Sequence, residues 1–150
     1  IFSELAIRYR KSPLVTEGEP RLRDGPQAGD RLPDVKLTRD GRPTYLLKEV
    51  CGPSFHLLLC GTPEDWNADV IAELTGSFPE ILALHYLSPN LTANILVDSN
   101  GEALNRLGIR DAGQYLVRPD GYIAYRCGGR DFRGVKQYLS NWYSTGPRTS

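Results

Sequence analysis

The sequence has no methionine, no net charge and no long apolar run, and the last two of these absences each exclude a class of partner. Lysine and arginine number 18, as do aspartate and glutamate, so the formal net charge is +0. This balance leaves no basic excess that would attract nucleic acid or an anionic membrane surface. The longest apolar runs, such as Phe55 to Cys60, are far too short to span a bilayer. We therefore expect neither a nucleic acid nor a membrane as a partner.

The chain also lacks paired cysteines and the residue spacing of a metal site. Its three cysteines, Cys51, Cys60 and Cys127, are odd in number, and no two of them are separated by two residues. This usage favours a reducing compartment, and no charged leader followed by an apolar stretch opens the chain, so we expect a cytoplasmic protein. His56 and His85 each lie inside an apolar strand, where a position in the core or on a sheet face is expected rather than a ligand. We predict no metal-binding residue.

The first 33 residues differ in character from the rest of the chain. Because the first residue is isoleucine rather than methionine, we expect an excised domain or a processed fragment. Residues 1–10 alternate as in a strand without a nearby partner, and residues 11–33 carry four prolines among glycines and charges. The second segment indicates a linker or a long loop that follows the surface. We therefore expect an N-terminal arm over 1–33, a compact domain over 34–145 and a polar tail over 146–150.

Apolar periodicity and turn residues predict regular elements from residue 34 onward. The continuous apolar run over 55–60 predicts a strand in the middle of a sheet that is covered on both faces. Thr62, Pro63 and the two acids that follow are typical of the first turn of a helix, which we expect to end at Gly76. The other expected elements are a strand near 35–37, a helical turn over 46–50, a strand over 81–87, a strand or helix approach over 95–98, a helix capped by Ser99 or Asn100 and ended by Gly108, and a last helix capped by Asp131.

Residues 114–126 predict a β-hairpin that precedes the last helix. Tyr115 and Val117 alternate with Leu116 along the first strand, and we expect Ile123 and Tyr125 to share one face of the second. The connection Arg-Pro-Asp-Gly has a proline that fixes φ and a glycine that permits positive φ. From residue 55 the order is strand, helix, strand, helix, strand, strand, helix. This order predicts a thioredoxin-like α/β fold, a mixed central sheet with helices on both faces and a C-terminal β-hairpin plus helix, in which the hairpin forms an antiparallel edge.

A working thiol oxidoreductase of this fold needs residues that the chain does not have. Such an enzyme places a thiolate at the start of its first helix, with a second cysteine three residues later. Cys60 lies just before that junction, but position 63 is proline and the acids Glu64 and Asp65 disfavour a nearby thiolate. The region before the hairpin also has no proline. A peroxidase that uses Cys60 alone remains an alternative to the reading of Cys60 as a buried residue at a strand end.

Two stretches of sequence resemble a known family. They are Gly29-Asp30-Arg31-Leu32-Pro33-Asp34 and Tyr115-Leu116-Val117-Arg118-Pro119-Asp120-Gly121, accompanied by Leu37, Gly41 and Arg126. Together they are similar to the C-terminal domain of FAD-dependent aromatic-ring hydroxylases, flavoprotein monooxygenases of the phenol hydroxylase, pentachlorophenol monooxygenase and polyketide hydroxylase type. Residues 9–15 resemble the segment with which the catalytic part of such enzymes runs into that domain.

The resemblance implies a parent enzyme that uses NAD(P)H, FAD and oxygen to hydroxylate an aromatic substrate. It also implies that this domain is a non-catalytic structural and interaction module, which packs on the enzyme's own N-terminal FAD and substrate part or helps subunits associate into a homo-oligomer. The chain has no Gly-x-Gly-x-x-Gly fingerprint for FAD, and its Gly128-Gly129 pair is better explained by a tight turn. We therefore predict no catalytic and no cofactor-binding residue in this fragment.

Three arginines near the hairpin admit two interpretations. Arg118, Arg126 and Arg130 could together bind a carboxylate or a phosphate. They could instead form salt bridges with Asp120, with Asp131 or with a partner domain. A binding module unrelated to any hydroxylase remains a further alternative for the whole chain.

Overall fold

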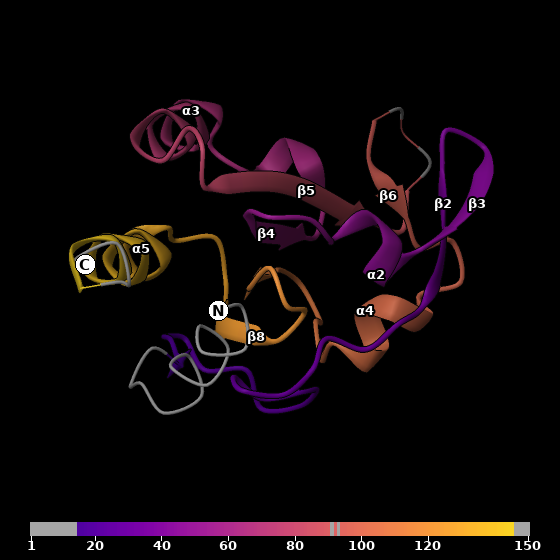
Figure 1. The fold of residues 1–150 in the computed structure, drawn as a ribbon. Coiled ribbons are helices and arrows are strands. Elements are labelled where there is room, and N and C mark those ends of the chain that lie inside the picture. The colour runs from indigo at the N-terminus through magenta and orange to yellow at the C-terminus, as the bar shows by residue number, and fades with distance from the viewer. Residues whose placement is uncertain (1–14, 91, 93, 146–150) are drawn as a thin grey trace.

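The computed structural model describes residues 15–90, 92 and 94–145 of the 150-residue chain. The strand expected over 1–10 and the tail expected over 146–150 therefore lie outside the described residues. In the described part, eight strands form one mixed sheet in the order β1-β8-β7-β4-β5-β6-β2-β3 (Figure 1). The elements are β1 (Thr16–Glu17), β2 (Lys36–Arg39), β3 (Arg42–Tyr45), α2 (Leu46–Glu49), β4 (Phe55–Cys60), a 3-10 turn (Pro63–Asp65), α3 (Ala68–Ser77), β5 (Leu82–Ser88), β6 (Leu96–Val97), α4 (Glu102–Arg106), β7 (Gly113–Val117), β8 (Ile123–Gly128) and α5 (Arg133–Thr145).

Two hydrophobic cores lie on opposite faces of the sheet. Strand β4 is buried at all six positions, because it lies between β5 and β7 and is covered on both sides. Leu57 and Leu59 pack toward α3 and α5, whereas Leu58 and Cys60 pack toward α2 and α4 (Figure 1). The predicted α/β class, with a mixed sheet and helices on both faces, is confirmed. No helix among the described residues is long and apolar enough to cross a membrane.

The helix expected to start at Thr62 begins later than the sequence pattern indicates. Residues 63–65 form only a short 3-10 turn, and Trp66 is extended and 5% exposed, packed in the core. Asn67 then caps α3, because its Oδ1 accepts hydrogen bonds from the backbone amides of Asp69 (3.0 Å) and Val70 (3.2 Å). Burial of the indole ring interrupts the helix that the proline and the acids favour.

Helix α4 has a second capping residue, Asp98, besides the expected Asn100. Asn100 Oδ1 accepts from the Glu102 amide, as expected, but Asp98 contributes more. The fully buried Asp98 carboxylate accepts from the amides of Ala103 (3.1 Å) and Leu104 (2.8 Å). A buried carboxylate at this end of the helix satisfies two amides that have no partner within the helix.

The hairpin of β7 and β8 contains a β-bulge that changes which side chains share a face. Leu116 pairs with Tyr125 and Val117 pairs with Ile123, so Ala124 is an extra residue in β8. Ile123 therefore faces the α2 and α4 side, whereas Tyr125 faces α3 and α5. The prediction that Ile123 and Tyr125 lie on the same face is wrong, because strict alternation does not hold across a bulge.

The hairpin is also not the edge of the sheet. Strand β1 lies outside β8 and pairs with it in parallel, with Thr16 opposite Tyr125 and Glu17 opposite Arg126. Residues 15–33 continue along the surface, where the Gly29 amide donates to the Ile123 carbonyl (2.7 Å). The expected antiparallel edge is thus covered by a short parallel strand from the N-terminal arm. The division of the chain at residue 33 stays a prediction.

Tyr125 connects three elements at this end of the molecule. Its side chain is 2% exposed and lies between Gly18, next to β1, and Gly134, at the start of α5. A Cβ atom added to either glycine would overlap the Tyr125 hydroxyl. The thiol of Cys127 interacts with that hydroxyl. The space between the two glycines therefore holds the Tyr125 side chain and leaves no room for a Cβ atom at either position.

Candidate functional site

The junction after β4 is where an enzyme of this fold would hold its reactive group, because β4 runs into the first long helix there. Cys60 ends the strand and is 0% exposed. Gly61 follows with φ of 135°, and a Cβ at this position would lie 3.0 Å from the Asp111 carbonyl oxygen. The chain segments before α3 and before β7 therefore touch at this point, and glycine allows the contact.

None of the three cysteines is placed as a reactive thiolate at this junction. Burial raises the pKa of Cys60, and the negative charge of Asp98 raises it further. Burial also raises the pKa of Cys127, on β8, which β7 separates from β4 in the sheet. Cys51 is exposed but lies before β4, and its thiol donates to the Lys48 carbonyl (3.1 Å). A buried, protonated thiol is a poor nucleophile.

Arg130, in the connection between β8 and α5, contacts the same junction. Its Nη2 lies 3.2 Å from Asp65 and 3.4 Å from Asp111, so it joins the segment before α3 to the segment before β7. Ala112 occupies the place before β7 where the sequence lacks proline, and its carbonyl accepts a hydrogen bond from the Gly129 amide (2.9 Å). The side chain of Arg130 is 31% exposed. An arginine and two carboxylates, and no thiolate, are thus paired beside the junction.

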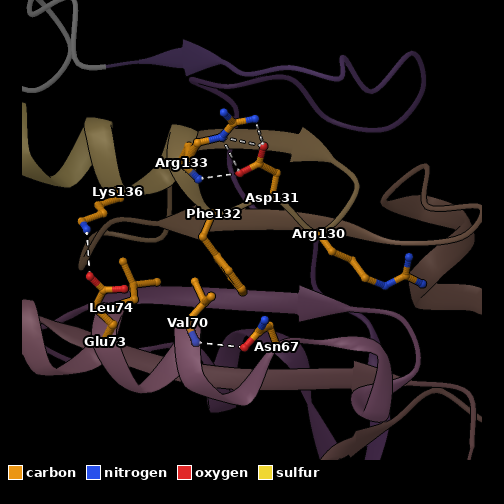
Figure 2. Close-up of a pocket in the computed structure, with 9 residues that line it drawn as sticks. All are labelled: Asn67, Val70, Glu73, Leu74, Arg130, Asp131, Phe132, Arg133 and Lys136. Atoms are coloured by element: carbon orange, nitrogen blue, oxygen red, sulfur yellow. Dashed lines mark hydrogen bonds and ion pairs between the residues drawn. The ribbon is translucent and has the colours of Figure 1, made fainter.

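A groove lies next to this junction, between α3 and the first turn of α5 (Figure 2). Its volume is about 340 Å³. Val70, Leu74 and Phe132 provide its apolar surface, and Arg130 points away from the other lining side chains. Two ion pairs lie beside it: Lys136 with Glu73 at 3.4 Å, and Arg133 with Asp131 at 2.6 Å.

The charged groups of this groove already have partners. Hydrogen bonds from Arg133 lower the pKa of Asp131, so this carboxylate is ionised near neutral pH but is a weak base. All four charged side chains of the two pairs are at least 46% exposed, and ion pairs of this kind contribute little stability. The groove therefore contains no acid, base or nucleophile that is prepared for catalysis.

The three arginines near the hairpin do not form one anion site. Arg118 is 2% exposed and donates to Asp120 through Nε (3.1 Å) and Nη2 (2.9 Å). Arg126 pairs with Glu17 at 2.7 Å, and Arg130 pairs as described above. Each guanidinium thus binds a different carboxylate. The salt-bridge interpretation describes these contacts, although the partners of Arg126 and Arg130 differ from those the sequence suggested.

The two histidines contact each other, although they lie on different strands and nothing in the sequence pairs them. His56 Nδ1 and His85 Nε2 are 2.9 Å apart, and their rings stack with centroids separated by 5.1 Å. Burial lowers the pKa of His56, and burial together with the neighbouring His56 lowers the pKa of His85 to about 4. Both rings are therefore neutral at pH 7. Their pairing follows from the register of β4 against β5, which places Leu58 opposite His85.

The described residues offer no ready site for a metal or for the pyrophosphate of a dinucleotide. No group of three or more His, Cys, Asp or Glu side chains in the described part of the chain could hold a metal ion. The amides of Gly128 and Gly129, the glycine pair at the end of β8, donate to the carbonyls of Pro20 (2.6 Å) and Ala112 (2.9 Å). These amides are engaged within the fold, so the pair does not fit the phosphate-binding turn of an FAD site.

Comparison with solved structures supports the fold. A thiol peroxidase from Chromobacterium violaceum superposes with a TM-score of 0.67 and 15% identity, over 86% of this chain and 96% of that chain. This likeness, together with that to Mycobacterium tuberculosis AhpC (TM-score 0.63, 13% identity, 82% and 96% coverage), confirms the predicted thioredoxin-like fold. At such identities the likeness concerns the fold alone.

Two matching structures are flavoenzymes, and the sequence itself matches a family. The flavin-dependent monooxygenase PieE, solved with FAD and substrate, matches with a TM-score of 0.64 and 22% identity over 87% of this chain. Aklavinone-11 hydroxylase, solved with FAD and aklavinone, matches with a TM-score of 0.61 and 25% identity over 83%. The chain spans only 22% and 24% of these two proteins.

Curated proteins give no significant sequence match. Residues 25–146, however, match the family described as aromatic-ring hydroxylase, C-terminal, and the chain therefore belongs to that family.

Proposed function

We propose that this chain is the redox-inactive, non-catalytic C-terminal domain of an FAD-dependent aromatic monooxygenase. The parent enzyme would use NAD(P)H and oxygen to hydroxylate an aromatic substrate in a separate part of the protein. The family match over residues 25–146 supports this assignment. So does the likeness to two flavin monooxygenases, of which this chain spans less than a quarter.

The observation that carries the non-catalytic role is the composition of the junction after β4. A thiol enzyme of this fold needs an exposed thiolate there, stabilised by a helix N-terminus or a nearby cation. In this chain the junction has a buried Cys60 and then Pro63, and Arg130 is paired with Asp65 and Asp111. The one nearby cation is thus neutralised by two carboxylates within the described fold. The junction after β4 therefore does not support thiol catalysis by this domain.

We further propose that the domain acts through contacts with the rest of its own enzyme. Its partners would be the N-terminal FAD and substrate part, or a second subunit in a homo-oligomer, and the protein would be cytoplasmic. FAD and NAD(P)H would bind outside this fragment. The absence of a Gly-x-Gly-x-x-Gly fingerprint supports this division, as does the internal use of the Gly128 and Gly129 amides.

The experiment that tests this proposal measures flavin binding and thiol turnover by the purified chain. Its absorbance after purification with added FAD should show no retained flavin, and its rate of insulin reduction by dithiothreitol should equal that of a Cys60→Ser variant. Retained flavin in a stoichiometric amount would contradict the assignment of FAD to another part of the enzyme. Insulin reduction that is lost in Cys60→Ser would instead support the alternative, a thiol oxidoreductase or peroxidase that uses Cys60.

A further inference from the structure

Residues 16–24 lie against the outer edge of β8 and pair with the second half of that strand, residues 125–128. Strand β1 pairs with β8 in parallel, and the Gly18 amide donates to the Arg126 carbonyl (2.7 Å). Further along, the Gly128 amide donates to the Pro20 carbonyl (2.6 Å). These bonds use backbone groups of β8 that would otherwise form an open sheet edge.

The side chain of Arg126 also binds this segment, through hydrogen bonds and an ion pair. It is only 3% exposed, and its Nε lies 2.7 and 3.0 Å from the two carboxylate oxygens of Glu17. Its Nη1 and Nη2 donate to the backbone carbonyls of Asp24 (2.8 Å) and Leu22 (3.0 Å). The Tyr115 hydroxyl, 3.2 Å from Nη1, completes the set. One guanidinium thus contacts the beginning and the end of the segment.

Glu17 joins this arrangement to the loop that follows. Its Oε2 accepts a hydrogen bond from the Ala28 amide (2.7 Å) in addition to the contact with Arg126. Because a buried guanidinium is costly without a counter-ion, Glu17 and Arg126 stabilise the docked arrangement only as a pair. Lysine could not replace Arg126, since a single ammonium group cannot reach a carboxylate and two carbonyls in the fork geometry of a guanidinium.

We propose that the outer edge of β8, with Arg126 at its centre, is a binding surface for an extended segment that carries a carboxylate, and that its occupant is this chain's own residues 16–24. We call this segment the strap. The strap adds to the sheet as an extra strand, and Arg126 is its positioning residue. The chain therefore enters the domain at a fixed joint on the sheet edge rather than through a flexible linker. The whole strap precedes the family match, which begins at residue 25.

The test measures whether the strap is fixed and whether Glu17 is what fixes it. Nitroxide labels would be placed on Cys51, which is exposed, and on an Arg21→Cys variant in the exposed part of the strap. Cys60 and Cys127 are buried and would not be labelled. Double electron–electron resonance should give one narrow distribution of the distance between the two labels. Adding Glu17→Gln to the labelled protein should broaden this distribution.

Hydrogen exchange separates local release of the strap from a loss of global stability. In Glu17→Gln the amides of Gly18, Ala28 and Gly128 should exchange faster by roughly ten- to hundred-fold, the size expected for losing a hydrogen bond to a charged group. Amides of the central strand β4 should be unchanged. Arg133→Ala is the matched control, because it removes an exposed arginine ion pair elsewhere and should leave the strap amides as they are.

Four results would overturn the proposal. One is a broad distance distribution in the labelled protein that keeps Glu17. Another is a hydrogen-exchange rate of the strap amides that Glu17→Gln does not change. The third is a uniform acceleration of amide exchange that includes β4. It would show that the Glu17–Arg126 pair stabilises the whole fold and not the strap in particular. A concentration-dependent dimer in which the strap of one copy docks on the other would likewise refute docking within one chain, and mixing singly labelled proteins detects it.

Discussion

The space around Tyr125 makes a quantitative prediction about a single added methyl group. In Gly134→Ala the new Cβ would overlap the Tyr125 hydroxyl, so either the ring or the start of α5 must move. Overpacking of this kind costs about 1–3 kcal/mol. Alanine also gains up to about 1 kcal/mol over glycine within a helix, which offsets part of that cost.

A second helical glycine allows the two contributions to be separated. Gly76 lies in α3, and nothing lies within 4 Å of a Cβ added there. Gly76→Ala should therefore show the helix gain alone and raise the free energy of unfolding. Because the gain is common to both substitutions, the difference between Gly134→Ala and Gly76→Ala isolates the overlap, at about 1–3 kcal/mol. Urea unfolding followed by circular dichroism and by tryptophan fluorescence measures this difference.

A second substitution tests the cause. Tyr125→Phe removes the hydroxyl that meets the new Cβ, together with the interaction of that hydroxyl with the Cys127 thiol. Adding Tyr125→Phe to Gly134→Ala should restore most of the lost stability. The ring carbon Cζ, 3.0 Å from the added Cβ, leaves a smaller overlap, so recovery should be incomplete. Equal stability of Gly134→Ala and Gly76→Ala, or a loss that Tyr125→Phe does not relieve, would refute the reasoning.

Other consequences concern pH, thiol access and helix capping. The pKa of His85 in the folded protein is about 4, below its ordinary 6.5, so the unfolded chain takes up the proton first as the pH falls. The free energy of unfolding should therefore decrease by about 1–3 kcal/mol between pH 6.5 and 4, and His85→Gln should reduce this slope in urea titrations at several pH values. A thiol reagent such as dithionitrobenzoate should modify one cysteine rapidly in the folded protein, a reaction that Cys51→Ser abolishes, and all three only after unfolding. Asp98→Ala should cost about 1–2 kcal/mol in urea unfolding, because the first amides of α4 lose their acceptor.

The elements that sequence patterns predict well here are those whose reasons are local. The six apolar residues of β4 require burial on both faces, and the structure places them at the middle of the sheet. The Arg-Pro-Asp-Gly connection is likewise confirmed as the turn between β7 and β8, with positive φ at Gly121. Asp131 caps the last helix through the Arg133 amide (2.9 Å), as expected.

The features that escape prediction depend on contacts between distant segments. Pairing of β1 with β8 joins residues more than a hundred positions apart, and no local pattern in a two-residue strand indicates it. The stacking of His56 on His85 depends on the register of β4 against β5, which the sequence of either strand leaves open. The break at Trp66 is a tertiary effect as well, since burial of the indole outweighs the helix-start signals before it.

The same distinction holds for the candidate site. The absence of a cysteine pair after β4 is visible in the sequence, and the burial of Cys60 in the structure gives it a physical consequence. The contribution of Arg130 is not visible in the sequence, because the carboxylates of Asp65 and Asp111 lie on segments remote from it and from each other.

The most direct test of the redox-inactive assignment is the rate of hydrogen peroxide consumption by the purified chain with dithiothreitol as reductant. This single measurement reports any turnover at Cys60, the one thiol at the junction after β4. The structure predicts a rate equal to that of buffer and of the Cys60→Ser protein, because burial and Asp98 both keep this thiol protonated. Saturable peroxide consumption that disappears in Cys60→Ser would contradict the account.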